Sequence, residues 1–196
     1  MKKLKLFLLA ALCLIGASAN AQNENGTTEG YQGFIELNMG RYVKSNDFRI
    51  FNMSTTHGVQ INPNVFVGAG IGYDFYAYAY ADEHDVKTDI SGSIPVFANF
   101  RWNVLDKKIS PVFDLKAGYT FGLEAVKTDN KYDIKNYVFT DGPSGFYTSV
   151  ALGCRFAFGT HAIVPQVRYK WIATKKVEGF NSDNVGFVTF GATYEF

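Results

Sequence analysis

From about residue 30 to the last residue, apolar and polar side chains alternate along the chain with a period of two. Such alternation places successive side chains on opposite faces of a β-strand, whereas a helix would repeat every 3.6 residues. The pattern recurs in eight segments separated by turn or loop residues. One face of its clearest example, the third segment, carries Val65, Val67, Ala69, Ile71, Tyr73 and Phe75. We therefore predict an all-β protein.

The eight segments are long, and the connections between them alternate in length. Each segment runs about 10 residues or more, which is enough for a tilted strand to cross a hydrocarbon layer. The short connections lie at 62–64, 105–110 and 159–161, and the mostly longer, more polar ones at 43–47, 81–85, 126–144 and 174–183. Short turns at one end and longer loops at the other are typical of membrane barrels. We predict an eight-stranded antiparallel up-and-down transmembrane β-barrel over residues 30–196.

Alternation is also compatible with a soluble β-sandwich or a soluble barrel, so the volume of the interior has to decide which face points outward. Eight strands enclose a space just wide enough for side chains. The many Phe, Tyr, Trp, Leu and Ile side chains would overfill it, whereas the other face is rich in Gly, Ser and Asn. Aromatic residues also gather toward the segment ends, with Tyr42, Phe48, Phe146 and Trp171 at the outer end. Rings at both edges would form girdles in lipid.

The N-terminus predicts export from the cytoplasm. Lys2, Lys3 and Lys5 precede an apolar stretch over 6–15, and small residues then offer a signal peptidase cut after Ala19 or Ala21. We predict a signal peptide over 1–21, followed by a short polar segment over 22–29. Without those lysines the chain is slightly acidic and has no basic stripe, so nucleic acid is not an expected partner.

The C-terminal segment ends on an aromatic residue, Phe196, which shares a face with Tyr194 and Phe190. Together with the leader, the eight segments and glycine–tyrosine pairs such as 118–119, this ending resembles the small OmpA/OmpX-type barrels, in particular the outer membrane protein beta-barrel domain families. The resemblance implies a bacterial outer-membrane location and contact with outer-membrane lipid. It also implies that the barrel-assembly machinery recognises the C-terminal strand.

Charged residues occur on the polar face of the predicted strands, which would point into the lumen. They are Glu36, Asp74, Arg101, Asp114, Lys116, Arg155, Arg168, Lys170 and Glu195. An unpaired buried charge costs several kcal/mol, so we expect these side chains to pair with one another. A salt-bridge network would fill the barrel, and a conductive path along the same charges is the alternative.

Catalytic and metal-binding patterns are weak. The acidic loop at 82–85 could hold a divalent cation, but contiguous acidic loop residues are more often simply solvated. Some outer-membrane barrels are lipid hydrolases, which need a nucleophile, a base and an acid in contact. Here Ser54 and Thr55 lie near His57, with no acid at a matching position. We predict no enzyme activity, cofactor or metal.

The function that the sequence favours is an integral outer-membrane barrel with a side-chain-filled lumen and a structural or surface-interaction role. The loop at 126–144 mixes charged and aromatic residues and could bind a surface ligand, because long loops on a rigid scaffold often carry binding sites. A narrow channel for small solutes or ions is the alternative, and a lipid hydrolase is a more distant one.

Overall fold

The computed structural model describes residues 30–44, 48–81, 86–124, 137–139, 141–174 and 184–196. Nine strands are present in these ranges: β1 (Gly30–Tyr42), β2 (Phe48–Asn62), β3 (Val65–Ala81), β4 (Val86–Asn103), β5 (Ile109–Gly122), β6 (Tyr137–Phe139), β7 (Gly145–Phe158), β8 (His161–Thr174) and β9 (Asn184–Glu195). Within the same ranges, no helix is long and apolar enough to cross a membrane.

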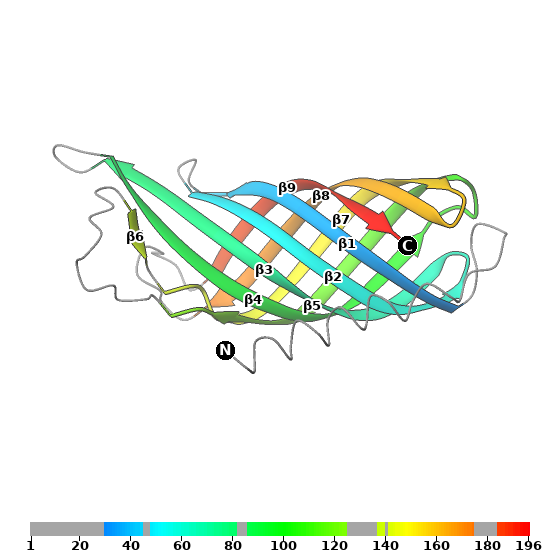
Figure 1. Ribbon diagram of the computed structural model, residues 1–196, viewed down its shortest axis with the longest axis horizontal. Coiled ribbons are helices and arrows are strands. Elements are labelled where there is room, and N and C mark those ends of the chain that lie inside the picture. Colours follow the sequence, from blue (N-terminus) through cyan, green and yellow to red (C-terminus); the bar gives the residue numbers. More distant parts are fainter. Residues whose placement is uncertain (1–29, 45–47, 82–85, 125–136, 140, 175–183) are drawn as a thin grey trace, which may run out of the picture.

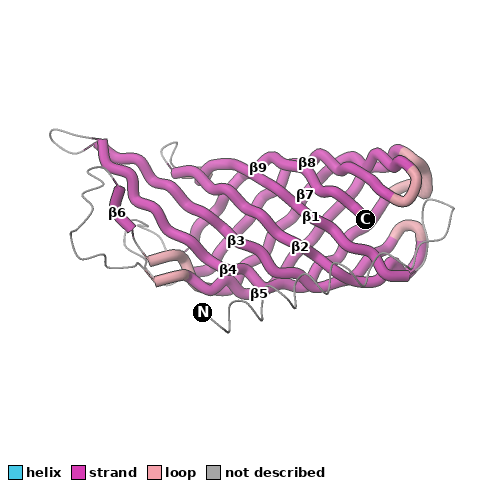
Figure 2. The backbone as a smooth tube through the Cα atoms, viewed as in Figure 1, coloured by secondary structure: helices cyan, strands magenta, loops and turns pink. Residues whose placement is uncertain are grey.

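Eight of the strands form a closed barrel in which each strand pairs antiparallel with its neighbours. The order around the barrel is β1, β2, β3, β4, β5, β7, β8 and β9, and β9 returns to β1 through pairs such as Phe34 with Glu195. Figures 1 and 2 show that the strands are tilted relative to the long axis of the barrel, as closure of a small barrel requires. The predicted eight-stranded antiparallel barrel is confirmed.

Turns at one end of the barrel are short and are specified locally by the sequence. Between β7 and β8 only two residues intervene, and Gly159 adopts a φ of 64°, the left-handed conformation that tight hairpins use. Between β2 and β3, the Asn62 side-chain oxygen accepts hydrogen bonds from the backbone N–H groups of Asn64 and Val65, both at 2.9 Å. Short turns are typical of the periplasmic end of membrane barrels, so we call this end the periplasmic end and the opposite one the outer end.

At the opposite, outer end, β3 and β4 continue beyond the rest of the barrel wall (Figure 1). Their pairing extends to Ala81 with Val86, whereas pairing of β4 with β5 stops at Ser93 with Gly122. The short strand β6 lies parallel to β4 over Thr88–Ile90 and covers part of this exposed edge. Of the predicted loops, 82–85 and most of 126–144 fall outside the described residues.

Each strand has an apolar face directed outward and a polar face directed into the lumen. On β1, Leu37 and Met39 are 47% and 64% exposed, whereas Glu36 and Asn38 between and beside them are 2% exposed. The same alternation runs through β2, β5, β7, β8 and β9. The prediction that the apolar face points outward is confirmed.

The expected outer girdle needs a correction. Phe146 and Trp171 lie on the outward face, but Phe48 is buried inside the barrel and Tyr42 packs against it. Tyr42 lies an even number of residues from the inward-facing Asn38 on β1, and Phe48 lies an even number of residues from the inward-facing Asn52 on β2. The period of two along the strand therefore determines which way these side chains point, whatever their apolar character.

Candidate functional site in the barrel lumen

The nine charged residues predicted to face the lumen all lie inside the barrel, and none is more than 4% exposed. They come from seven of the eight barrel strands: Glu36 (β1), Asp74 (β3), Arg101 (β4), Asp114 and Lys116 (β5), Arg155 (β7), Arg168 and Lys170 (β8), and Glu195 (β9). Ion pairs connect each of them to at least one of the others. The lumen is therefore filled by five cationic side chains and four carboxylates that pair with one another.

Toward the periplasmic end, Arg101 bridges two carboxylates. Its Nε lies 3.0 Å from Asp114 Oδ2, and its Nη1 lies 2.9 Å from Glu195 Oε1. The other oxygen of Glu195 accepts a hydrogen bond from Arg155 Nε at 2.7 Å. The planar guanidinium group suits this arrangement because it presents several donors in fixed directions.

In the middle of the lumen, Arg168 and Glu36 form the centre of the network. Arg168 Nη2 donates to Glu36 Oε2 at 2.9 Å and to Asp114 Oδ1 at 2.8 Å. Lys116 Nζ donates to Glu36 Oε1 at 2.9 Å, and Thr193 donates to Glu36 Oε2 at 3.2 Å. Asp114 thus joins the middle group to the periplasmic group, so the ion pairs are not independent of one another.

Nearer the outer end, Lys170 pairs with Asp74. Asp74 also accepts hydrogen bonds from the Asn52 amide at 2.6 Å and from the Tyr76 hydroxyl at 3.1 Å. A buried carboxylate that receives one cation and two neutral donors is well compensated for its loss of water. This pair marks the boundary between the ionic region and an aromatic one.

Three of the lumen cations also lie over inward-facing aromatic rings. The Arg101 guanidinium carbon is 4.0 Å from the centroid of the Phe34 ring. Lys116 Nζ lies 4.5 Å from the Phe97 ring, and Lys170 Nζ lies 4.6 Å from the Tyr147 ring. Desolvated cation–π contacts of this kind stabilise a structure by about 2 kcal/mol each. The rings and the charges therefore form one packed interior.

Beyond Lys170, the outer end of the lumen is closed by an apolar cluster, which we call the outer aromatic cluster. It consists of Phe48, Ile50, Tyr76, Phe97, Tyr147, Ile172, Val185 and Phe187, with Tyr42 and Tyr78 packed against it. Phe187 contacts the rings of Phe48 and Tyr76, with centroid separations of 5.7 Å and 5.5 Å. These distances are in the range of favourable aromatic pairs.

Glycines on the inward face of β3 make room for the rings. A Cβ atom added to Gly68 would lie 2.6 Å from the ring of Phe66, and one added to Gly70 would lie 2.5 Å from the ring of Phe97. Because both distances are far below van der Waals contact, small residues at these positions and large rings beside them form complementary pairs.

What this arrangement does physically is close the lumen. A cavity of about 20 Å³ remains in the middle, lined by Glu36, Lys116, Arg168 and Lys170 among others. That volume is on the scale of a single water molecule. The inward-facing aromatic residues were not predicted, although they occupy the same alternate positions along each strand as the polar lumen residues and could have been found in that way.

The candidate hydrolase residues are divided between the two faces of β2: Ser54 points into the lumen, whereas Thr55 and His57 share the outward face. Ser54 is buried in the lumen, where its hydroxyl lies 3.5 Å from Lys116 Nζ. His57 is on the outward face, where it contacts the Tyr31 hydroxyl and lies 2.9 Å from Thr55 Oγ1. The acidic loop 82–85, proposed above as a possible cation site, lies outside the described residues.

The C-terminal aromatic residues line the outward face of β9. Phe190 is 61% exposed, and Tyr194 stacks on Phe196 with a centroid separation of 6.3 Å. Phe196 continues the pairing with β1 through two backbone hydrogen bonds to Gly33, each of 3.0 Å. The expected peptidase positions Ala19 and Ala21 fall in the part of the chain that the structure does not describe.

No family model and no curated protein matches the sequence. Solved structures do resemble the fold. Neisserial surface protein A aligns with a TM-score of 0.54 and 13% identity over 89% of this chain and 98% of that one. The outer membrane protein OprG of Pseudomonas aeruginosa aligns with a TM-score of 0.52 and 8% identity over 89% and 99%. The outer membrane enzyme PagL aligns at 0.41, with 9% identity over 83% and 98%.

The barrel fold and the apolar outer surface together define the class of this protein. It is a small outer-membrane β-barrel, as the sequence predicted. A fold of this kind hosts several functions, so the role of the chain has to be argued from its lumen and surface.

Proposed function

We propose that this protein is a closed, non-catalytic outer-membrane barrel that serves as a rigid scaffold with a structural or surface-interaction role. The observation that carries the proposal is the packed lumen, in which nine paired charges adjoin the outer aromatic cluster. A channel needs a continuous polar path, whereas here the cavity beside Glu36, Lys116 and Arg168 has a volume of only about 20 Å³.

The energetics of the ion pairs support a permanently closed state. Opening a path past Arg168 would separate it from Glu36 and Asp114 together, and both carboxylates are buried. Breaking a buried pair costs about 3–5 kcal/mol. Asp114 shares its charge with Arg101 as well, so displacing one side chain weakens a second pair.

The outer end of the barrel supports the surface role. The β3–β4 hairpin continues beyond β5, and β6 covers part of its edge (Figure 2). A rigid extension of this kind can carry the connecting loops, including the one at 126–144, away from the membrane for contact with a partner. Binding residues frequently lie on loops that a rigid scaffold positions.

Conductance of the purified barrel in planar lipid bilayers tests the closed state. We expect no discrete openings for the wild-type protein, and none of large amplitude for Arg101→Ala or Glu36→Ala, although both variants should be less stable. Lys107→Ala is the matched control because Lys107 is exposed in the turn between β4 and β5. Regular ion-selective openings of the wild-type barrel would favour the narrow channel instead.

Catalysis is tested separately, by comparing the lipids of a strain that lacks the protein with those of its parent. We expect identical acyl-chain composition, because Ser54 and His57 lie on opposite faces of β2 and Thr55, which does contact His57, has no acidic residue on its face of that strand. Loss of a deacylated lipid species in the deletion strain, restored by the wild-type gene, would point to a hydrolase.

We further propose that the last strand carries the signal for the barrel-assembly machinery. Phe190 and Tyr194 are exposed on the outward face of β9, where an assembly factor can contact them before the barrel closes. Replacing Phe196 with Ala should slow the appearance of folded, heat-modifiable protein in cells. Refolding of the same variant in detergent should change much less, because no assembly factor acts there.

A further inference from the structure

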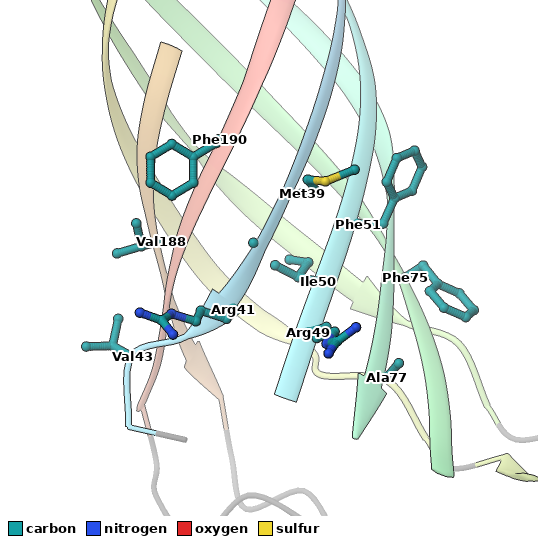
Figure 3. Close-up of a pocket in the computed structure, with 11 residues that line it drawn as sticks. Met39, Arg41, Val43, Arg49, Ile50, Phe51, Phe75, Ala77, Val188 and Phe190 are labelled. Carbon is teal, nitrogen blue, oxygen red and sulfur yellow. The ribbon is translucent and has the colours of Figure 1, made fainter. Parts of the chain in front are cut away.

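The lumen cavity brings cationic side chains together, whereas a groove on the outer surface does not. The groove, of about 880 Å³, is lined by Arg41 and Arg49, but Arg41 extends toward β9 and Arg49 lies toward β3 (Figure 3). The lumen cavity, of about 20 Å³, is lined by three cationic side chains and, among its described lining residues, by one carboxylate: Lys116, Arg168, Lys170 and Glu36. A space on the scale of one water molecule places its lining groups within reach of a single occupant.

The ionic part of the lumen has more positive than negative charge. Its described side chains are five cations and four carboxylates when all of them are ionised. Each carboxylate already has a cationic partner, and Glu36 is shared between Lys116 and Arg168. The excess charge is therefore buried without a counter-ion of its own, which is unfavourable in a medium of low polarity. A small anion beside these cations would remove that cost.

The cavity also has hydrogen-bond donors in excess. The Ser149 hydroxyl oxygen accepts from Arg168 Nη1 at 2.8 Å, and the Ser54 hydroxyl oxygen lies 3.5 Å from Lys116 Nζ. Because both oxygens act as acceptors, each serine keeps its own proton for donation, and no acceptor for either proton lies among the described residues. Arg168 Nε is buried and has no hydrogen-bond partner in the same part of the chain. Both serines and Arg168 line the cavity.

The carboxylate beside the cavity is already fully engaged, which favours an anion over a water molecule. Glu36 Oε1 accepts hydrogen bonds from the Asn38 amide and from Lys116, at 2.9 Å each. Glu36 Oε2 accepts from Arg168 at 2.9 Å and from Thr193 at 3.2 Å. A buried water molecule both donates and accepts hydrogen bonds, so it needs free acceptors as well as donors. A halide ion only accepts, so it suits a cavity that has spare donors and an occupied carboxylate.

We propose that the lumen cavity binds one halide ion, chloride in the cell, as an integral part of the folded barrel. The ion accepts hydrogen bonds from the Ser54 and Ser149 hydroxyl groups and from Arg168 Nε, and it balances the excess positive charge. Ile50, Phe97 and Tyr147 of the outer aromatic cluster line the same cavity. The ion is therefore enclosed as the barrel folds, and it stays bound instead of permeating. Folding then depends on the halide concentration.

Urea titration of the folded barrel in detergent tests the site when chloride replaces gluconate at constant ionic strength. Above the dissociation constant, a tenfold rise in chloride should raise the folding equilibrium constant about tenfold, because the ion binds only the folded chain. The S54A/S149A double variant keeps every charge and should lose this dependence. Ser93→Ala is the matched control, since Ser93 is also buried in the lumen but does not line the cavity, and it should keep the dependence.

Anomalous X-ray scattering locates the ion directly. Crystals of the wild-type barrel refolded in sodium bromide should contain a bromide peak in the cavity, between Ser54 and Ser149, and crystals of S54A/S149A should not. Heat-modifiable gel mobility verifies that each variant is folded. A wild-type folding equilibrium that does not respond to chloride would overturn the proposal, as would a wild-type cavity without an anomalous peak. Equal chloride dependence of the wild type and S54A/S149A would also overturn it, because the ion would then bind elsewhere.

Discussion

The two halves of the lumen are closed by different kinds of interaction. In the middle and toward the periplasm, buried charges pair through a network centred on Arg168, Glu36 and Asp114. At the outer end, the rings of the outer aromatic cluster pack around Phe187, and Lys116 and Lys170 border the cluster by lying over its Phe97 and Tyr147 rings. Ion pairs are stabilised by matched donors and acceptors, whereas the aromatic cluster is stabilised by burial of apolar rings that fill the available volume. The difference implies that mutations in the two halves will have different signatures.

The largest expected effect is at the centre of the ionic half. Arg168→Ala removes the cation shared by Glu36 and Asp114 and leaves both buried carboxylates with one fewer partner. We expect the free energy of unfolding to fall by about 3–5 kcal/mol. Urea titration of the folded barrel in lipid vesicles measures it, with Lys107→Ala as an exposed control that should stay within about 0.5 kcal/mol. A loss equal to that of the control would show that the ionic half does not stabilise the barrel.

Phe187→Ala is the corresponding change in the outer aromatic cluster. Phe187 is fully buried against Phe48 and Tyr76, so truncation should leave a cavity and cost about 3 kcal/mol. Phe190→Leu, on the lipid-facing side of the same strand, should cost far less. The same urea titration applies. If the two substitutions cost the same, packing inside the outer end is not what distinguishes Phe187.

A smaller effect is expected where glycine and ring are complementary. Gly68→Ala places a methyl group 2.6 Å from both the Phe66 ring and the His57 backbone oxygen, and overpacking of this kind costs about 1–3 kcal/mol. The double variant G68A/F66L should recover part of the loss. A double-mutant cycle measures the coupling between the two positions, and strictly additive effects would contradict the contact.

The smallest change in the free energy of unfolding is expected when the charge at position 101 is kept and only the hydrogen-bonding geometry is altered. Arg101→Lys keeps the positive charge but cannot reach Asp114 and Glu195 through separate, fixed donors. A loss of about 1 kcal/mol is expected, corresponding to about one hydrogen bond. Arg101→Met tests the charge itself and should cost more. Equal stability of the lysine variant and the wild type would mean that charge alone suffices in the ionic half.

The sequence predicted the barrel and the faces of its strands because a period of two is a local property. Glu36 and Arg168 could be assigned to the lumen in this way, since their neighbours along the strand are apolar. Which of the nine charges meet could not be predicted, because pairs such as Arg168 with Glu36 depend on how strands distant in sequence are staggered across the barrel.

The outer aromatic cluster was missed for a different reason. The sequence interpretation weighed Phe48 by its hydrophobicity and assigned it to a lipid girdle, although its parity placed it with Asn52 inside the barrel. A lumen filled only by small and ionic side chains was expected. Gly68 and Gly70 instead provide space for the inward-facing rings of Phe66 and Phe97.

The unequal lengths of the strands give the molecule a fixed reach above the lipid. From Ser93, where pairing with β5 ends, to Val86, the β4 strand continues for about 20 Å along its own direction. The last pair of this ladder, Ala81 with Val86, therefore lies well beyond the point where the neighbouring β4–β5 ladder ends. A partner that meets this pair need not contact the body of the barrel.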